Sequence, residues 1–289
     1  MDTNFIVIFS YFIVIYRIVQ LYEVLIAMSF QNQFTKTTTD ANLMETVHHG
    51  SAEYPFRYYY ENIALFDFKC IDWHWHSELE FIYIESGNVV FDIGTVHFEL
   101  NEGNGIMINS KILHRLQSSS DAIIPNFLFQ PSFIAPQDSL IYKKYINPVI
   151  SSSLEYLVFQ PDIPWQKKVL EIIKTIIAVQ ETEFNREIIV SMSVQQLWIL
   201  LLENLTFDQF ENMGAVISRT RLQLMMQYVH AHYSENITLE DIARTANISK
   251  STALHLFQNN LKLTPVKYLI NYRLTQAALL LINTEEKIA

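Results

Sequence analysis

Two histidines and a glutamate lie close together in the segment DWHWHSELEFIYIESG, which covers residues 72–87. His74 and His76 have the same parity along an extended segment, and Glu80 keeps that parity. Because side chains alternate between the two faces of a β-strand, we expect these three to point into one cavity. Imidazoles and a carboxylate can hold a metal ion or hydrogen-bond to a small polar molecule. Trp73 and Trp75 can be core residues on the opposite face.

Turn residues divide the chain around these side chains into short segments. Glu85–Asn88 carries a turn signal, Gly94 marks another reversal, and residues 101–105 (NEGNG) turn the chain again. The segments between these turns, NVVFDI, TVHFEL and IMINSKILH, are typical of strands. Several short strands with frequent turns indicate a small β-barrel or jelly roll.

This stretch resembles a cupin over about residues 56–120. The spacing HxH-x3-E-x6-G of the first cupin motif is matched by His74, His76, Glu80 and Gly87. The second motif is matched by Gly103 and His114, but has Asn109 and Lys111 in place of its usual Pro and Gly. The resemblance therefore adds a third histidine to the cluster. The ligand-binding residues that it implies are His74, His76, Glu80 and His114.

Three chemical roles remain open for this cluster. Three neutral imidazoles and one carboxylate suit Fe, Mn, Ni or Zn, although nothing in the sequence requires a resident cofactor. The same residues can line a polar pocket for a small-molecule effector without metal, or form a purely structural cluster. A metal would also permit catalysis, so a metal-dependent cupin enzyme of the dioxygenase or isomerase type is the alternative function. His48, His49 and His97 show no partner pattern and are expected on the surface or in strands.

Residues Thr238–Gln258, TLEDIARTANISKSTALHLFQ, have the pattern of a complete helix-turn-helix. Thr238 and Ser249 are good N-caps, and Asp241 nearly completes a capping box with Thr238. Asn247 stands where the chain must reverse with positive φ. The positions that face each other are apolar or small, namely Ile242, Ala243, Ala246, Ile248, Ala253 and Leu256. The pattern favours DNA binding, and the alternative is an ordinary helical hairpin.

The charge distribution supports DNA binding by this end of the chain. Residues 219–289 carry eight Lys and Arg against five Asp and Glu, whereas the whole chain has a net charge of −10. A basic surface around the motif is what phosphate binding requires. The outward side of the second helix is expected to face the major groove with Ser249, Lys250, Ser251 and His255. The phosphate contacts are expected from Arg221, Lys262 and Lys267.

Residues 221–282 resemble the first half of an AraC/XylS-family DNA-binding domain. The match consists of an amphipathic helix, the segment NITLEDIARTANISKSTALHLFQ, and LKLTPVKYLINYRLTQAALLL, in which Thr264-Pro265 opens a helix. Lys262 stands where the family usually has Gly, and His255 where it often has Arg. The resemblance implies a second helix-turn-helix after residues 284–289, so we expect a C-terminally truncated chain with weak, strongly salt-dependent DNA binding.

The chain is therefore expected to be an α+β multidomain protein. We expect a hydrophobic N-terminal extension over residues 1–43, a cupin-like sensing barrel over 44–136, a helical segment over 137–218 and an all-α helix-turn-helix domain over 219–289. The helical segment includes amphipathic helices at Trp165–Val179 and Arg186–Leu205. These two helices have more apolar surface than they can bury against each other, so we expect them to form a homodimer contact. The alternative is that this surface packs only within the core of the same chain.

Residues 5–28 form an apolar stretch interrupted by Arg17 and Glu23. Three interpretations remain open: an upstream-extended gene start, with Met44 as the natural start, a membrane anchor, or a packing helix. The single cysteine, Cys70, excludes a disulfide framework and favours a reducing compartment. Together these features predict a cytoplasmic, non-enzymatic regulator that binds double-stranded DNA and responds to a small-molecule effector.

Overall fold

The computed structural model describes residues 37–40, 43–94, 96–182, 184–205, 213–261 and 263–283. The predictions for the N-terminal extension before residue 37, its possible membrane segment and residues 284–289 lie outside these ranges. Within them, no helix is both long and apolar enough to cross a lipid bilayer.

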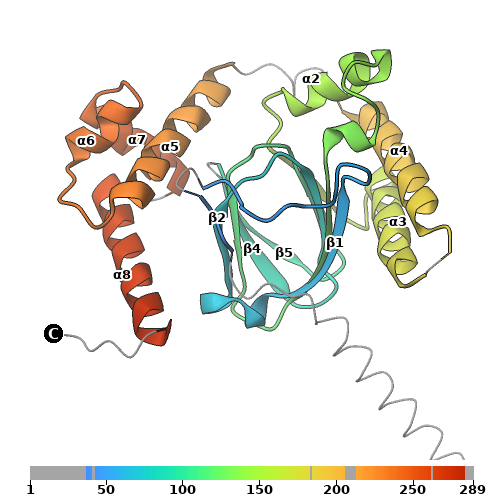
Figure 1. The fold of residues 1–289 in the computed structure, drawn as a ribbon, viewed down its shortest axis with the longest axis horizontal. Helices are drawn as coiled ribbons and strands as arrows, with labels where there is room; N and C mark the ends of the chain where they lie inside the picture. The colour runs from blue at the N-terminus through green and yellow to red at the C-terminus, as the bar shows by residue number, and fades with distance from the viewer. Residues whose placement is uncertain are drawn as a thin grey trace, which may run out of the picture.

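Two antiparallel sheets face each other and make up the N-terminal half of the fold (Figure 1). The five-stranded sheet contains, in order, β1 (Phe56–Asn62), β8 (Ile123–Phe129), β3 (Leu79–Tyr83), β6 (Gly105–Ile108) and β9 (Tyr156–Phe159). The four-stranded sheet contains, in order, β2 (Cys70–His74), β7 (His114–Gln117), β4 (Asn88–Ile93) and β5 (Val96–Asn101). Aliphatic and aromatic side chains from both sheets, among them Ile82, Phe91 and Leu116, fill the space between them. The expected series of short strands is confirmed.

The segment after β8 mixes short helical turns, a strand and two long helices. Among the described residues, the short helical turns are η2 (Ile63–Leu65) and η3 (Asp67–Lys69) before β8, and η4 (Pro131–Phe133), η5 (Tyr142–Ile146), α2 (Asn147–Ile150) and η6 (Val179–Glu181) after it. The expected long helices are confirmed as α3 (Pro164–Ala178) and α4 (Arg186–Asn204), which cover the five-stranded sheet. The description of residues 137–218 as purely helical needs correction, because β9 extends the sheet by pairing with β6.

Four helices make up the C-terminal part: α5 (Met213–His232), α6 (Leu239–Thr245), α7 (Lys250–Leu261) and α8 (Pro265–Asn283). Thr238 and Asp241 form a complete capping box at the start of α6. Asn247 has φ of 51° in the turn before α7, as expected for a residue that must reverse the chain. Ser249 accepts from the backbone N–H of Thr252 and so caps α7.

The expected packing between α6 and α7 is also present. Ile242, Ala243, Ala246, Ala253 and Leu256 are buried, and Ile248 is half-buried. Together with apolar residues of α5 they form the core of the helical part. These local features follow directly from residue type, because caps, small residues and a left-handed turn residue act over a few neighbouring positions.

One apolar cluster joins the helical part to the four-stranded sheet. Trp73, near the end of β2, and Leu113, just before β7, pack in the same cluster as Met225, Met226 and Val229 of α5. Figure 1 shows α5 and α8 beside this sheet, with α3 and α4 on the opposite side of the strands. The sheets and the helical part therefore meet through a packed contact.

Candidate functional site

A change of register in β2 places the first histidine of the cluster. β2 pairs with β7, and the register shifts between Ile71 and His74, as at a β-bulge. The backbone N–H of Trp73 donates to the Asp72 side chain in this interval (2.8 Å). The extra residue makes both Ile71 and His74 face the interior, where simple alternation would have put them on opposite faces.

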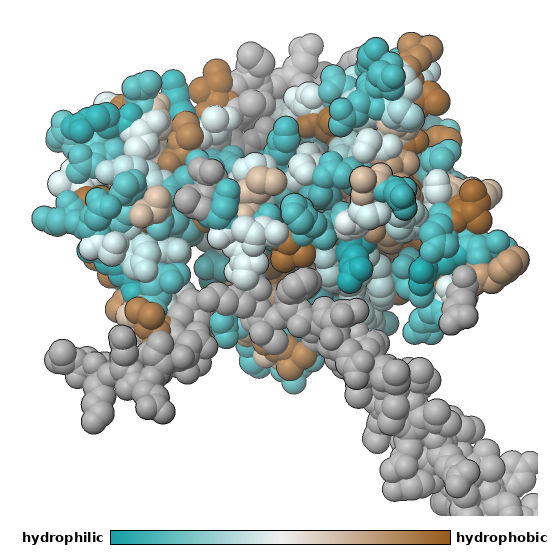
Figure 2. All heavy atoms as spheres, in the orientation of Figure 1, coloured by the Kyte–Doolittle hydropathy of each residue, from teal (hydrophilic) through white to brown (hydrophobic). Residues whose placement is uncertain are grey.

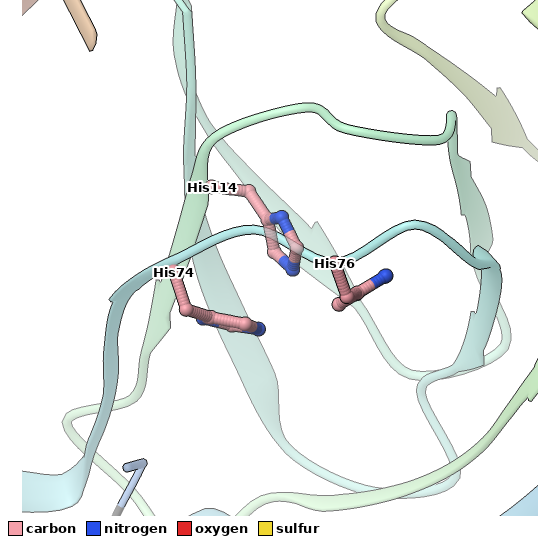
Figure 3. A group of neighbouring side chains, drawn as sticks. All are labelled: His74, His76 and His114. Atoms are coloured by element: carbon pink, nitrogen blue, oxygen red, sulfur yellow. The ribbon is translucent and has the colours of Figure 1, made fainter. Parts of the chain in front are cut away.

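The other three members come from three further places in the fold. His76 follows the end of β2, Glu80 lies in β3 of the opposite sheet, and His114 begins β7. The single continuous strand expected for His74, His76 and Glu80 is therefore not what brings them together. The expected convergence is nevertheless found, because the ligand atoms of the three histidines lie within 4.8 Å of one another, and Figure 3 shows the three side chains as neighbours. All four residues are buried.

Each imidazole of the cluster uses its Nδ1 atom to hold its own orientation. The Nδ1 atoms lie 2.8, 3.2 and 2.8 Å from the backbone carbonyl oxygens of Asp72, Glu78 and Ile112, in His74, His76 and His114 respectively. A carbonyl only accepts, so each Nδ1 carries the proton, and Nε2 remains to face the centre. Metal-binding histidines in proteins are commonly fixed in this way.

Glu80 completes the ring of donors. One of its carboxylate oxygens, Oε2, lies 3.1 Å from Nε2 of His114 and 3.4 Å from Nε2 of His76. The Nε2 atom of His114 is buried and has no hydrogen-bond partner of acceptable geometry among the described residues. One ligand atom from each histidine lies within 4.8 Å of one from each of the others. Three nitrogens and a carboxylate at this spacing fit a divalent transition metal.

The electrostatics of the cluster separate its members into charged and neutral groups. Burial, aided by the neighbouring His114, lowers the pKa of His74 to about 3, so this ring is neutral at physiological pH. Burial opposes ionisation of Glu80, but the adjacent imidazoles of His114 and His76 outweigh it and hold the pKa of this carboxyl well below the usual range. Burial also opposes the charge on His76, yet Glu80 raises the pKa of that ring. An anionic carboxylate beside imidazoles is the donor set that a cation requires.

Four polar residues that the sequence did not indicate lie beside the cluster. They are Glu45, His49, Tyr59 and Glu61, and they line a small cavity together with His74 and Glu80. The expectation of a surface or strand position for His49 is wrong: it is buried outside any strand, and its ring nitrogens hydrogen-bond to Tyr59 (2.9 Å) and Glu45 (3.1 Å). This segment reaches the cluster because Met44 forms a bridge with Trp75.

The volume of this cavity limits what can bind. It measures about 30 Å³, which is room for one or two water molecules or for an ion. Pockets for organic ligands typically measure several hundred Å³. An organic effector in this cavity, against His74 and Glu80, would therefore require the two sheets to move apart, whereas an ion would not.

The residues expected to contact DNA lie on or near one exposed face of α7. Ser249, Lys250, Ser251 and His255 are exposed. Nζ of Lys250 lies 3.2 Å from a carboxylate oxygen of Glu240 on α6, and the His255 ring hydrogen-bonds to Asn259 (2.9 Å). Exposed ion pairs contribute little, so DNA phosphates or bases can replace these partners.

The three residues expected at phosphates are less uniform. Lys267 is exposed near the start of α8, and Arg221 is half-buried on α5. Lys262 lies outside the described residues. The helices carrying Lys250 and Lys267 are adjacent in sequence and pack together through Phe257 and Tyr268, whose rings meet edge to face.

Comparisons with known proteins find similarity to transcriptional regulators. Residues 66–136 match a family model described as the AraC-like ligand binding domain. The uncharacterized HTH-type transcriptional regulator YdeC of Bacillus subtilis is 32% identical over 256 residues, covering 86% of each chain. The lactose operon transcription activator of Staphylococcus xylosus is 25% identical over 167 residues, covering 56% of this chain and 59% of that protein. ToxT from Vibrio cholerae, a solved structure, is 13% identical with a TM-score of 0.33 and covers 75% of this chain and 98% of its own.

Proposed function

The chain belongs to the AraC family of HTH-type transcriptional regulators, and from this premise we propose how its parts divide the work. The sheets, with β9 included, act as the sensor, and the helix pair α6–α7 reads DNA. Residues 137–218, apart from β9 and the first residues of α5, connect the two parts and carry a dimer contact. Residues 219–289, together with the start of α5 at Met213, form the DNA-binding domain. We place the protein in the cytoplasm, because its proposed DNA partner lies there and because a chain with a single cysteine forms no internal disulfide.

The exposed start of α7 supports the assignment of DNA reading to this helix. Recognition helices present the residues of their N-terminal half to base edges in the major groove. Lys250 can donate to guanine, whereas His255 can donate and accept, depending on its tautomer. The capping box and the left-handed Asn247 fix the angle between α6 and α7, so the exposed residues are held by a rigid pair of helices.

A binding experiment tests this assignment directly. Duplexes enriched by the protein from a random DNA pool should bind wild type, and Lys250→Ala or His255→Ala should cost about 1–3 kcal/mol on that duplex. Lys143→Ala is a matched control, because Lys143 lies in η5, outside the proposed DNA-binding part. Equal loss in the control, or no loss in either α7 variant, would contradict the assignment.

We also propose that the buried cluster binds a divalent transition metal. The observation that supports this most strongly is the convergence of three buried imidazoles, whose ligand atoms lie within 4.8 Å of one another, on the carboxylate of Glu80. The named relatives are transcriptional regulators, which favours a structural or sensing role over catalysis. A bound ion would link β2, β3 and β7 across the two sheets.

Cobalt provides a suitable probe for this metal site, because its visible spectrum reports coordination by nitrogen and oxygen. The metal-free protein should bind one Co²⁺ per chain with a new absorption band, and His114→Ala should abolish the band. His97→Ala is the matched control, since His97 is exposed on β5 and hydrogen-bonds to Asp92 instead. Equal cobalt binding by wild type and His114→Ala would refute the proposal.

The exposed side of α4 supports the proposed dimer. Ile188, Met192 and Ile199 lie on it with exposed fractions of 58%, 66% and 57%, at spacings that fall on one side of a helix. Figure 2 shows small hydrophobic areas at the edge of the molecule where α3 and α4 lie. Exposed apolar side chains that repeat along one helix are typical of a protein–protein contact.

A further inference from the structure

A second and much larger cavity lies between the sensor sheet and helix α8. Its volume is about 720 Å³, within the range of pockets for small organic molecules. The wall on the sensor side is formed by polar residues of the four-stranded sheet, namely Cys70, Asp72, Asp92 and Arg115. The opposite wall comes from helices α5 and α8, with His230, Tyr268, Asn271 and Tyr272. Both parts of the protein therefore contribute to one cavity.

The charge of the lining favours a cation. Among its described residues are three carboxylates, those of Asp67, Asp72 and Asp92, against the single guanidinium of Arg115. Arg115 is already engaged, because its Nε donates to Cys70 Sγ (3.1 Å) and lies 3.4 Å from Asp72. His230 adds no charge at physiological pH, since burial lowers its pKa to about 4. The carboxylates thus exceed the positive charges available to them inside the cavity.

An aromatic wall lies across the cavity from these carboxylates. The ring of His230 stacks on Tyr272 with centroids 3.8 Å apart, and it hydrogen-bonds to the Tyr268 hydroxyl (2.7 Å). Asp72 and Tyr272 both line this cavity, and burial together with the negative charge of Asp72 raises the pKa of Tyr272 to about 12. Aromatic faces and carboxylates together attract organic cations through cation–π and Coulomb interactions.

One edge of the cavity is formed by Phe68, which is apolar and lies in a stretch of strained backbone. Phe68 is 57% exposed and lines the cavity. Phe68 and Lys69 both have positive φ, of 58° and 51°, a conformation that residues other than glycine rarely adopt because it is strained. Strain of this kind gathers at ligand-binding loops, and an exposed phenylalanine suits an apolar ligand body.

We propose that this cavity is the effector site, and that the effector is a small organic cation with an apolar or aromatic body. The inference rests on the proposed regulatory function and assigns the effector to a place outside the buried histidine cluster. A ligand held between Asp72 on β2 and Tyr272 on α8 stabilises one arrangement of sensor and helical part. Because α8 packs on α7, binding there changes the population of the DNA-competent arrangement.

The test uses defined probes with the full chain: benzyltrimethylammonium, neutral benzyl alcohol and anionic phenylacetate, titrated by calorimetry. We expect saturable binding of the cation, at least tenfold weaker binding of the other two, and at least a tenfold loss in Tyr272→Ala and in Asp67→Asn. Glu99→Gln is the matched control, because Glu99 is exposed on β5 and does not line the cavity, and this variant should bind the cation as wild type does. Circular dichroism of each variant checks that it is folded.

Two outcomes overturn the inference. One is equal binding of the three probes, or no saturable binding of the cation at millimolar concentration. The other is wild-type binding by both Tyr272→Ala and Asp67→Asn. The affinity of the same samples for the enriched DNA duplex is also measured. If the protein binds this DNA but not the cation, the effector site is refuted and the proposed regulatory function stands. If wild type does not bind the DNA duplex at all, the proposed regulatory function itself is refuted.

Discussion

Glu61 provides a quantitative test of the buried polar network beside the histidine cluster. Its carboxylate is buried and accepts a hydrogen bond from Asn126 Nδ2 (2.6 Å). Burial raises its pKa from 4.5 to about 8, with only partial opposition from Asn126. The folded protein therefore holds a proton on Glu61 across a pH range in which the unfolded chain has released it.

The sign of the pH dependence follows from proton binding. Between pH 4.5 and 8 the native state binds more protons than the unfolded state at this group, so the free energy of unfolding falls as pH rises. With those two pKa values, the loss between pH 5 and pH 7.5 is about 3 kcal/mol. Glu61→Gln mimics the protonated carboxyl at all pH values, and we expect it to remove this decline.

Urea unfolding at a series of pH values, in the presence of a chelator, measures the effect. Subtracting the wild-type curve from that of Glu61→Gln isolates the group, because buried His74 and His230 contribute equally to both proteins. The difference should grow in favour of the variant by about 3 kcal/mol from pH 5 to pH 7.5. A flat difference would refute the buried, protonated state of Glu61, and Glu99→Gln should give a flat difference as the control.

Three further substitutions test other parts of the structure. Thr238→Ala removes the side-chain cap of α6 and should lower the free energy of unfolding by about 1 kcal/mol in urea titrations, whereas Thr175→Ala, at an exposed position inside α3, should cost less. Asn109→Ala should cost about 1–3 kcal/mol in the same assay, because Nδ2 of Asn109 donates to the buried carbonyls of Val149 (3.0 Å) and Leu154 (2.8 Å). Met192→Glu should convert a dimer to a monomer in light scattering, and a monomeric wild type would contradict the proposed contact.

The sequence was sufficient for features that depend on neighbouring residues. The capping box of Thr238, the left-handed Asn247 and the inward positions of α6 and α7 follow from local chemistry, and all are present. The convergence of His74, His76, Glu80 and His114 was also predicted, with His114 supplied by the cupin resemblance. In these cases the information lies in residue type and short spacing.

Non-local pairing explains what the sequence did not predict. β9 is a four-residue strand between helical segments, and it is stabilised by pairing with β6, about fifty residues earlier. His49 reaches the cluster only because residues 43–45 bridge to Trp75. The register shift before His74 and the large cavity between sheet and α8 likewise depend on packing between distant segments. Parity and periodicity carry no information about such contacts.

The central claim is that α7 reads DNA sequence, and the most direct measurement is the base preference that wild type and three variants each select from the same random duplex pool. Wild type should enrich a defined motif, and His255→Ala should enrich a motif that differs at one or two adjacent base pairs. Lys143→Ala should enrich the wild-type motif. Identical motifs for wild type and His255→Ala, together with an unchanged motif for Lys250→Ala, would show that sequence is read elsewhere and would contradict the account.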